Sequence, residues 1–90
     1  MQEWDIGLSR QAEKFLAQHH LPDTFTVGPL RKAIQKLQGA VVTVDLKSLS
    51  GKWEGCYRIR TGKIRIIFSM NVETRYILVE IIDTRGSAYK

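Results

Sequence analysis

The strongest constraint on the fold of this 90-residue sequence is the alternation of side chains over positions 56–68, CYRIRTGKIRIIF. Apolar residues occupy every second position on both sides of Thr61-Gly62, as in β-strands that bury one face. A two-residue turn at Thr61-Gly62 would join these strands into a hairpin, in which residues opposite each other share a face. The pattern predicts an apolar face and a face with four cations: Arg58, Arg60, Lys63 and Arg65.

The position of this turn sets the pairs across the hairpin. Arg60 would lie opposite Lys63, and Arg58 opposite Arg65. Like charges that face each other destabilise a sheet by roughly 0.2–1 kcal/mol per pair. A protein tolerates this repulsion when an anion normally binds there, so we interpret the cationic face as an anion-binding surface. The alternative interpretation is a solvated face that keeps the protein soluble.

A last strand is predicted over 75–82, after a second turn at 71–74. This turn would set Glu80 beside Arg65, which makes Glu80 the one carboxylate among the predicted cations. We interpret Glu80 and Arg65 as an ion pair. Glu80 or Asp45 is also a candidate general base.

The first half of the chain predicts one strand and two helices. Trp4, Ile6 and Leu8 alternate as in a half-buried strand, and Ser9 then offers a helix cap. A second helix is expected from near Pro29 to near Gly39, and a further short strand is a candidate at 41–44. The order β-α-α-β-β-β predicts an α+β fold, a single domain over 1–90, with two helices packed on one face of a small, mostly antiparallel sheet.

Composition narrows the classes of partner. The net charge of +5 and the pI near 9.7 favour anionic partners. No apolar run approaches the roughly 18 residues of a membrane span, and no secretory signal is present, so a cytoplasmic location is expected. The single Cys56 excludes an internal disulfide and a cysteine-based zinc site, and we expect it to be an inert packed thiol. No metal-ligand spacing is present.

Four segments together carry a resemblance to a known family. In chain order they are Leu49-Ser50-Gly51, Tyr57-Arg58-Ile59-Arg60, the strand GKIRIIF over 62–68, and Arg85 with Tyr89 four residues on. The sequence resembles the RelE/ParE toxin superfamily of type II toxin–antitoxin systems. RelE-like members of that family are ribosome-dependent endoribonucleases that cut mRNA in the A site, and ParE-like members inhibit DNA gyrase.

The resemblance to the RelE-like branch implies roles for individual residues. Arg65 corresponds to the arginine that stabilises the scissile phosphate. Arg58 and Arg60 stand where relatives often carry lysine, and an arginine keeps its proton and is a poor proton-transfer group. Arg85 and Tyr89 correspond to the C-terminal site, where the tyrosine acts near the 2′-hydroxyl or stacks on a base.

The function expected from the resemblance is metal-independent mRNA cleavage by 2′-OH attack on the adjacent phosphate. Lys52 and Lys63 are further candidates for RNA binding. The expected partners are a cognate antitoxin, the ribosome and mRNA, with no cofactor and no membrane. Thr84 replaces a histidine that some relatives carry, so the site lacks an acid–base histidine. The alternative is a ParE-like gyrase inhibitor without nuclease activity.

Overall fold

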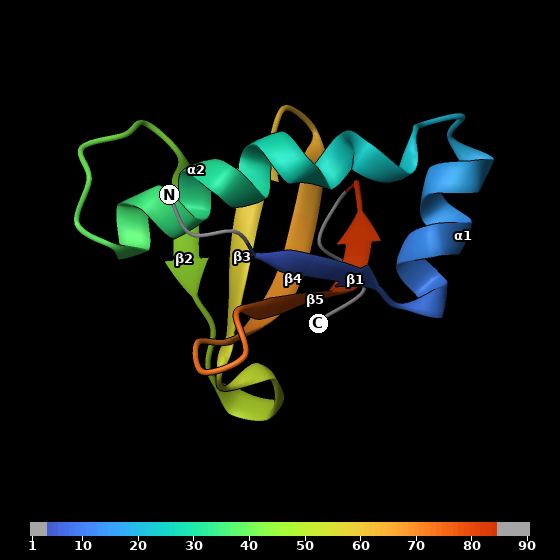
Figure 1. Cartoon of the computed structure of the whole chain (residues 1–90). Helices are drawn as coiled ribbons and strands as arrows, with labels where there is room; N and C mark the ends of the chain where they lie inside the picture. The colour runs from blue at the N-terminus through green and yellow to red at the C-terminus, as the bar shows by residue number, and fades with distance from the viewer. Residues whose placement is uncertain (1–3, 85–90) are drawn as a thin grey trace.

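The computed structural model describes residues 4–84 of the chain (Figure 1). Two α-helices, five strands and two short 3-10 helices follow one another in the order β1 (Asp5–Leu8), α1 (Arg10–Gln18), η1 (Asp23–Thr26), α2 (Val27–Leu37), β2 (Asp45–Ser48), η2 (Gly51–Trp53), β3 (Cys56–Thr61), β4 (Ile64–Asn71) and β5 (Tyr76–Asp83). None of the helices within residues 4–84 is long and apolar enough to cross a membrane.

The five strands form one sheet in the order β1-β5-β4-β3-β2. β1 runs parallel to β5, and the other neighbours are antiparallel. The predicted α+β class and the mostly antiparallel sheet are confirmed. The candidate strand at 41–44 is wrong, because β2 begins only at Asp45 and adds a fifth strand to the predicted order.

Local sequence explains where the helices begin and end. The Ser9 hydroxyl oxygen accepts from the N–H of Ala12 (3.1 Å), which confirms the predicted cap of α1. Gly39 follows α2 at φ +96°, and the N–H groups of Gly39 and Ala40 donate to carbonyls of the last turn. His20 takes the equivalent place after α1 at φ +56°. Both helices thus end in the left-handed turn that glycine favours.

The core lies between the two helices and one face of the sheet. Both helices contribute a stripe of buried residues that contacts alternate residues of the central strands, as the sequence predicts. The cluster comprises Ala12, Phe15, Leu16, Leu30, Ala33, Ile34, Ile59, Ile66, Phe68, Ile77, Val79 and Ile82. Fully burying one such aliphatic or aromatic side chain contributes roughly 1.5–3 kcal/mol, so this face fixes the orientation of every strand. We call the other side of the sheet the open face.

The observed register of the β3–β4 hairpin differs by two residues from the predicted one. Thr61 pairs with Ile64, so the two turn residues are Gly62 and Lys63. Gly62 adopts φ +62° at the first turn position, which suits glycine in tight hairpins. Because a shift of two residues keeps every side chain on its predicted face, the apolar and cationic faces are assigned correctly although the pairs are not.

A β-bulge interrupts the ladder between β4 and β5. Phe68 pairs with Val79, whereas Ile67 pairs with Ile81, so Glu80 is the extra residue. After this bulge Ile82 is fully buried in the core. The bulge therefore changes which residues of β5 can reach the cations on the open face.

Candidate functional site

Four charged residues lie in a line across the open face, one from each of four neighbouring strands. Asp45 of β2 pairs with Arg60 of β3, Arg60 pairs with Arg65 of β4, and Arg65 pairs with Asp83 of β5. Directly opposite residues of a sheet have Cβ atoms only about 4.5–5.5 Å apart. We call Asp45, Arg60, Arg65 and Asp83 the cross-strand row. Two arginines occupy its centre, and a carboxylate stands at each end.

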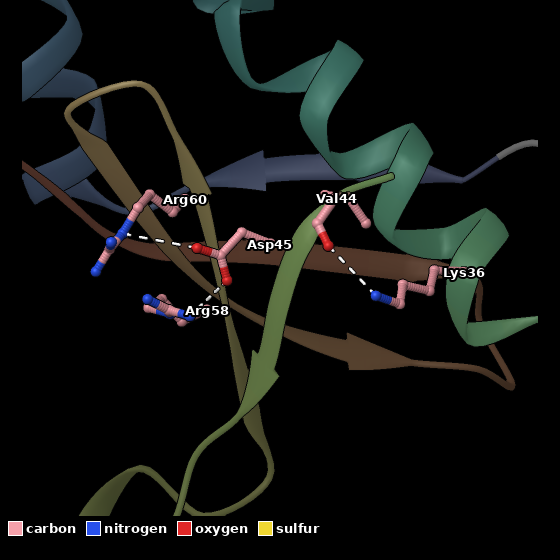
Figure 2. A network of polar contacts seen from close by, with 5 residues as sticks. All are labelled: Lys36, Val44, Asp45, Arg58 and Arg60. Carbon is pink, nitrogen blue, oxygen red and sulfur yellow. Dashed lines mark hydrogen bonds and ion pairs between the residues drawn. The ribbon is translucent and has the colours of Figure 1, made fainter. Parts of the chain in front are cut away.

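Asp45 holds two arginines with its two carboxylate oxygens (Figure 2). Its Oδ1 accepts a hydrogen bond from Arg58 Nη2 at 2.9 Å, and its Oδ2 lies 3.8 Å from Arg60 Nε. On the side of α2, Lys36 Nζ donates to the carbonyl oxygen of Val44 at 3.3 Å. This bond ties α2 to the residue just before β2 and so helps to place Asp45.

Arg58 is buried, although the sequence predicts an exposed cation. It points to the open face, but the residue is only 8% exposed, and its strand partner Ile67 is 1% exposed. Its Nε is buried without a hydrogen-bond partner. An arginine packed in this way depends on its ion pair with Asp45, because a buried charge without a partner is costly.

Arg60 and Arg65 form the cationic part of the row. The side chain of Arg60 is 44% exposed and Arg65 is half-buried. The predicted pairs Arg58 with Arg65 and Arg60 with Lys63 are wrong, because the turn lies one residue later in the chain. The result is two arginines directly opposite each other on neighbouring strands, and guanidinium groups suit the oxygens of a phosphate.

Glu80 does not pair with Arg65, so the predicted ion pair is wrong. The β4–β5 pairing is shifted by two residues from the predicted register and the bulge adds one more, so Arg65 lies opposite Asp83. The Glu80 carboxylate instead accepts a hydrogen bond from the Ser69 hydroxyl at 3.1 Å. Burial, and then the negative charge of Glu80, raise the pKa of the Cys56 thiol. Glu80 therefore interacts electrostatically with the Cys56 thiol and by a hydrogen bond with Ser69, and it is not the ion-pair partner of Arg65.

The remaining predicted site residues lie apart from the row or outside the description. Lys63 is exposed in the hairpin turn, and Lys52 is exposed in η2, at the end of β3 away from that turn. Arg85 and Tyr89 lie outside the described residues, so their roles stay predictions. Within residues 4–84 no three His, Cys, Asp or Glu side chains gather as a metal site would require.

Asp45 is the residue that sequence reasoning undervalues. The sequence suggests it only as a base, and the strand predicted at 41–44 ends just before it. The alternation of Asp45 and Lys47 with Leu46, directly before the Leu49-Ser50-Gly51 segment, is the signal that could have revealed β2.

The fold and the site define a class: a small α+β protein whose sheet is covered by two helices on one face and carries paired arginines on the other. No protein-family model and no curated protein matches the chain. Solved structures do match over nearly the whole length. The toxin–antitoxin complex RelBE2 from Mycobacterium tuberculosis gives a TM-score of 0.60 at 21% identity, covering 97% of both chains.

Two further structures agree with this match. A mutant of YafQ from E. coli gives a TM-score of 0.63 at 20% identity, covering 98% of this chain and 100% of the other. The archaeal RelE–RelB complex from Pyrococcus horikoshii OT3 gives 0.56 at 24% identity, covering 96% and 99%. The chain has the fold of the RelE and YafQ toxins of toxin–antitoxin systems.

Proposed function

We propose that this protein is the toxin of a toxin–antitoxin system and that it cuts mRNA on the ribosome. The observation that carries the proposal is the pair of opposite residues Arg60, which is exposed, and Arg65, which is half-buried, on the open face of a fold shared with RelE and YafQ toxins. A pair of like charges at this spacing is unfavourable by itself and becomes favourable when an anion lies between the guanidinium groups.

The proposed reaction is attack of a ribose 2′-OH on the adjacent phosphate. The 2′-OH gives up its proton and its oxygen forms a bond to phosphorus, the bond to the 5′ oxygen of the next nucleotide breaks and this oxygen takes up a proton, and a 2′,3′-cyclic phosphate remains. Arg65 and Arg60 stabilise the negative charge that develops on the phosphate oxygens. A fixed donor at such a position contributes on the order of 10²–10³ in rate.

Both carboxylates considered as the general base already have partners. The proposed mechanism therefore also depends on the ribosome. Glu80 is engaged with Ser69, and Asp45 is engaged with two arginines. Tyr89 is the proposed proton-transfer or base-stacking group. We propose that the ribosome bends the mRNA and aligns its 2′-OH with the phosphate, since orientation alone can remove about 7–11 kcal/mol from a barrier.

An antitoxin is the second proposed partner. Relatives of this fold were solved as complexes of RelE with RelB and of YafQ with DinJ. We propose that an acidic segment of the antitoxin covers the open face, because both RNA and such a segment would use the same arginines. The electrostatic part of that contact should weaken as salt increases.

The test uses programmed ribosomes, purified protein and labelled mRNA. We expect cleavage of ribosome-bound mRNA, little cleavage of naked mRNA, and products that end in a 2′,3′-cyclic phosphate. The protein is treated with EDTA beforehand, and the Mg²⁺ that ribosomes need is restored afterwards. Arg65→Ala should lower the cleavage rate much more than it lowers binding to the ribosome.

A supercoiling assay with DNA gyrase runs in parallel. Intact ribosome-bound mRNA together with inhibited gyrase would reject the proposal and favour the ParE-like function. Cleaved mRNA with fully active gyrase supports the RelE-like function.

A further inference from the structure

We propose that Asp45 is a positioning residue that fixes the guanidinium of Arg60 for phosphate binding, with buried Arg58 as its anchor. This inference deepens the proposed function and rests on it. It also changes the role of Arg58, which the family resemblance places among the catalytic residues. In this arrangement Arg58 acts through Asp45 and does not touch RNA.

Asp45 is held firmly for a residue on an edge strand. Its backbone pairs with Arg60, and the carbonyl of the preceding Val44 accepts from Lys36 of α2. Its Oδ1 is engaged at 2.9 Å by an arginine whose side chain is 10% exposed. Since Arg58 is enclosed by the protein, this ion pair orients the whole carboxylate.

The second oxygen of Asp45 is then directed at Arg60. Oδ2 lies 3.8 Å from Arg60 Nε, and Asp45 is the only carboxylate among residues 4–84 within ion-pair distance of Arg60. The carboxylate lies closest to the Nε of the guanidinium, so the opposite end of the group can bind a ligand. Arg65, on the neighbouring strand, lies directly opposite Arg60.

A phosphate does not simply replace Asp45. Displacing the carboxylate would leave Arg58 buried without a partner, and such a charge is strongly unfavourable. Arg60, by contrast, has an exposed side chain and a longer contact, so it can gain a ligand while it keeps Asp45. Asp45 thus also reduces the repulsion that Arg60 experiences from Arg65.

The test is a double-mutant cycle on single-turnover cleavage of ribosome-bound mRNA. Asp45→Asn should lower the rate about tenfold, which lies within the coupling energies of contacting residues, and should leave ribosome affinity unchanged. In an Arg60→Ala background, Asp45→Asn should have almost no effect on the rate. Equal losses in both backgrounds would overturn the proposal, because Asp45 would then act independently of Arg60.

A second variant guards against loss of folding. Asp45→Glu keeps a carboxylate for Arg58 and should retain a rate between those of the wild type and Asp45→Asn. Any decrease in rate that Asp45→Glu causes should disappear in the Arg60→Ala background. A decrease that persists there would count against positioning. Asp23→Asn, the same chemical change at an exposed carboxylate of η1, is the matched control and should leave the rate unchanged.

An NMR measurement separates this inference from the proposed function. In ¹⁵N relaxation the Arg60 Nε–H group should be more ordered in the wild type than in Asp45→Asn, because the carboxylate restrains the guanidinium. Equal order in both proteins would refute positioning, whatever the cleavage assay shows. A wild-type protein with an ordered Arg60 Nε–H that does not cut mRNA would reject the proposed function but leave the positioning of Arg60 by Asp45 in place.

Discussion

The side-chain amide of Gln11 pairs with both backbone groups of Ile82. Gln11 Nε2 donates to the carbonyl of Ile82 at 2.8 Å, and Gln11 Oε1 accepts from its N–H at 2.9 Å. β1 stops pairing with β5 at Leu8 and Val79, so Gln11 continues the ladder with a side chain. This contact joins α1 to the strand that leads into Asp83 of the cross-strand row.

Replacing Gln11 should destabilise the fold. Gln11→Ala leaves two backbone groups of fully buried Ile82 without partners, which should cost about 1–3 kcal/mol. Urea unfolding measures the loss. Gln18→Ala, at an exposed position of the same helix, is the control and should change stability by less than about 0.5 kcal/mol. Equal effects of the two substitutions would contradict the role of the Gln11 amide.

The conformation after α2 predicts opposite effects of one substitution at two glycines. Gly39→Ala should destabilise by about 1–2 kcal/mol, because φ is +96° there. Gly28→Ala should stabilise by about 0.5–1 kcal/mol, because Gly28 lies inside α2 and an added Cβ meets no atom within 4 Å. Thermal unfolding of both variants is the measurement. Stabilisation by both would show that Gly39 does not need its left-handed conformation.

The two faces of β4 predict different failures at neighbouring positions. Ile66→Asp places a charge in the core, where Ile66 is fully buried, and should unfold the protein. Arg65→Ala, on the open face, should leave the melting temperature nearly unchanged while the proposed mRNA cleavage and toxicity fall. Circular dichroism and growth assays distinguish them. Unfolding by Arg65→Ala with a folded Ile66→Asp would reverse the assignment of the faces.

The raised pKa of Cys56 predicts a thiol that is alkylated slowly at neutral pH. Burial first and Glu80 second favour the neutral form, so less thiolate is present at neutral pH than for an ordinary cysteine. The pH dependence of alkylation by iodoacetamide should therefore have a midpoint above that of the urea-unfolded chain. Glu80→Gln should move the midpoint down, and Glu73→Gln, exposed before β5, should not. A folded midpoint at or below the unfolded one would refute the shift.

The sequence predicts which faces are buried better than which residues pair. Alternation in β3 and β4 places Ile59 and Ile66 in the core, because only one phase of a strand is apolar. The turn is less determined, since Thr61-Gly62 and Gly62-Lys63 both contain glycine and both keep this phase. The apolar run that follows Glu80 tolerates several registers, so the bulge is fixed only by packing in three dimensions.

For the candidate site too, the sequence predicts the face on which a residue lies better than its contacts. The open face of cations follows from the strand period, and Arg60 and Arg65 lie on it as predicted. The burial of Arg58 could not be predicted, because it depends on its strand partner Ile67 and on the ion pair with Asp45. Strand propensity misplaces β2, because the valine-rich segment at 41–44 has a higher propensity than Asp45–Ser48 and outweighs the short alternation there.

The placement of β1 has a consequence for how the protein is made. The sheet neighbour of β1 is β5, and Ser9 and Gln11 find their partners 71 residues further along the chain. Contacts between distant parts of a chain form late, and a sheet in which β1 must wait for β5 cannot fold from its N-terminus as translation proceeds. The arginines of β3 and β4 are synthesised before β5 can complete the sheet beside them. A nascent chain of this protein therefore becomes a folded molecule only after β5 has left the ribosome that made it.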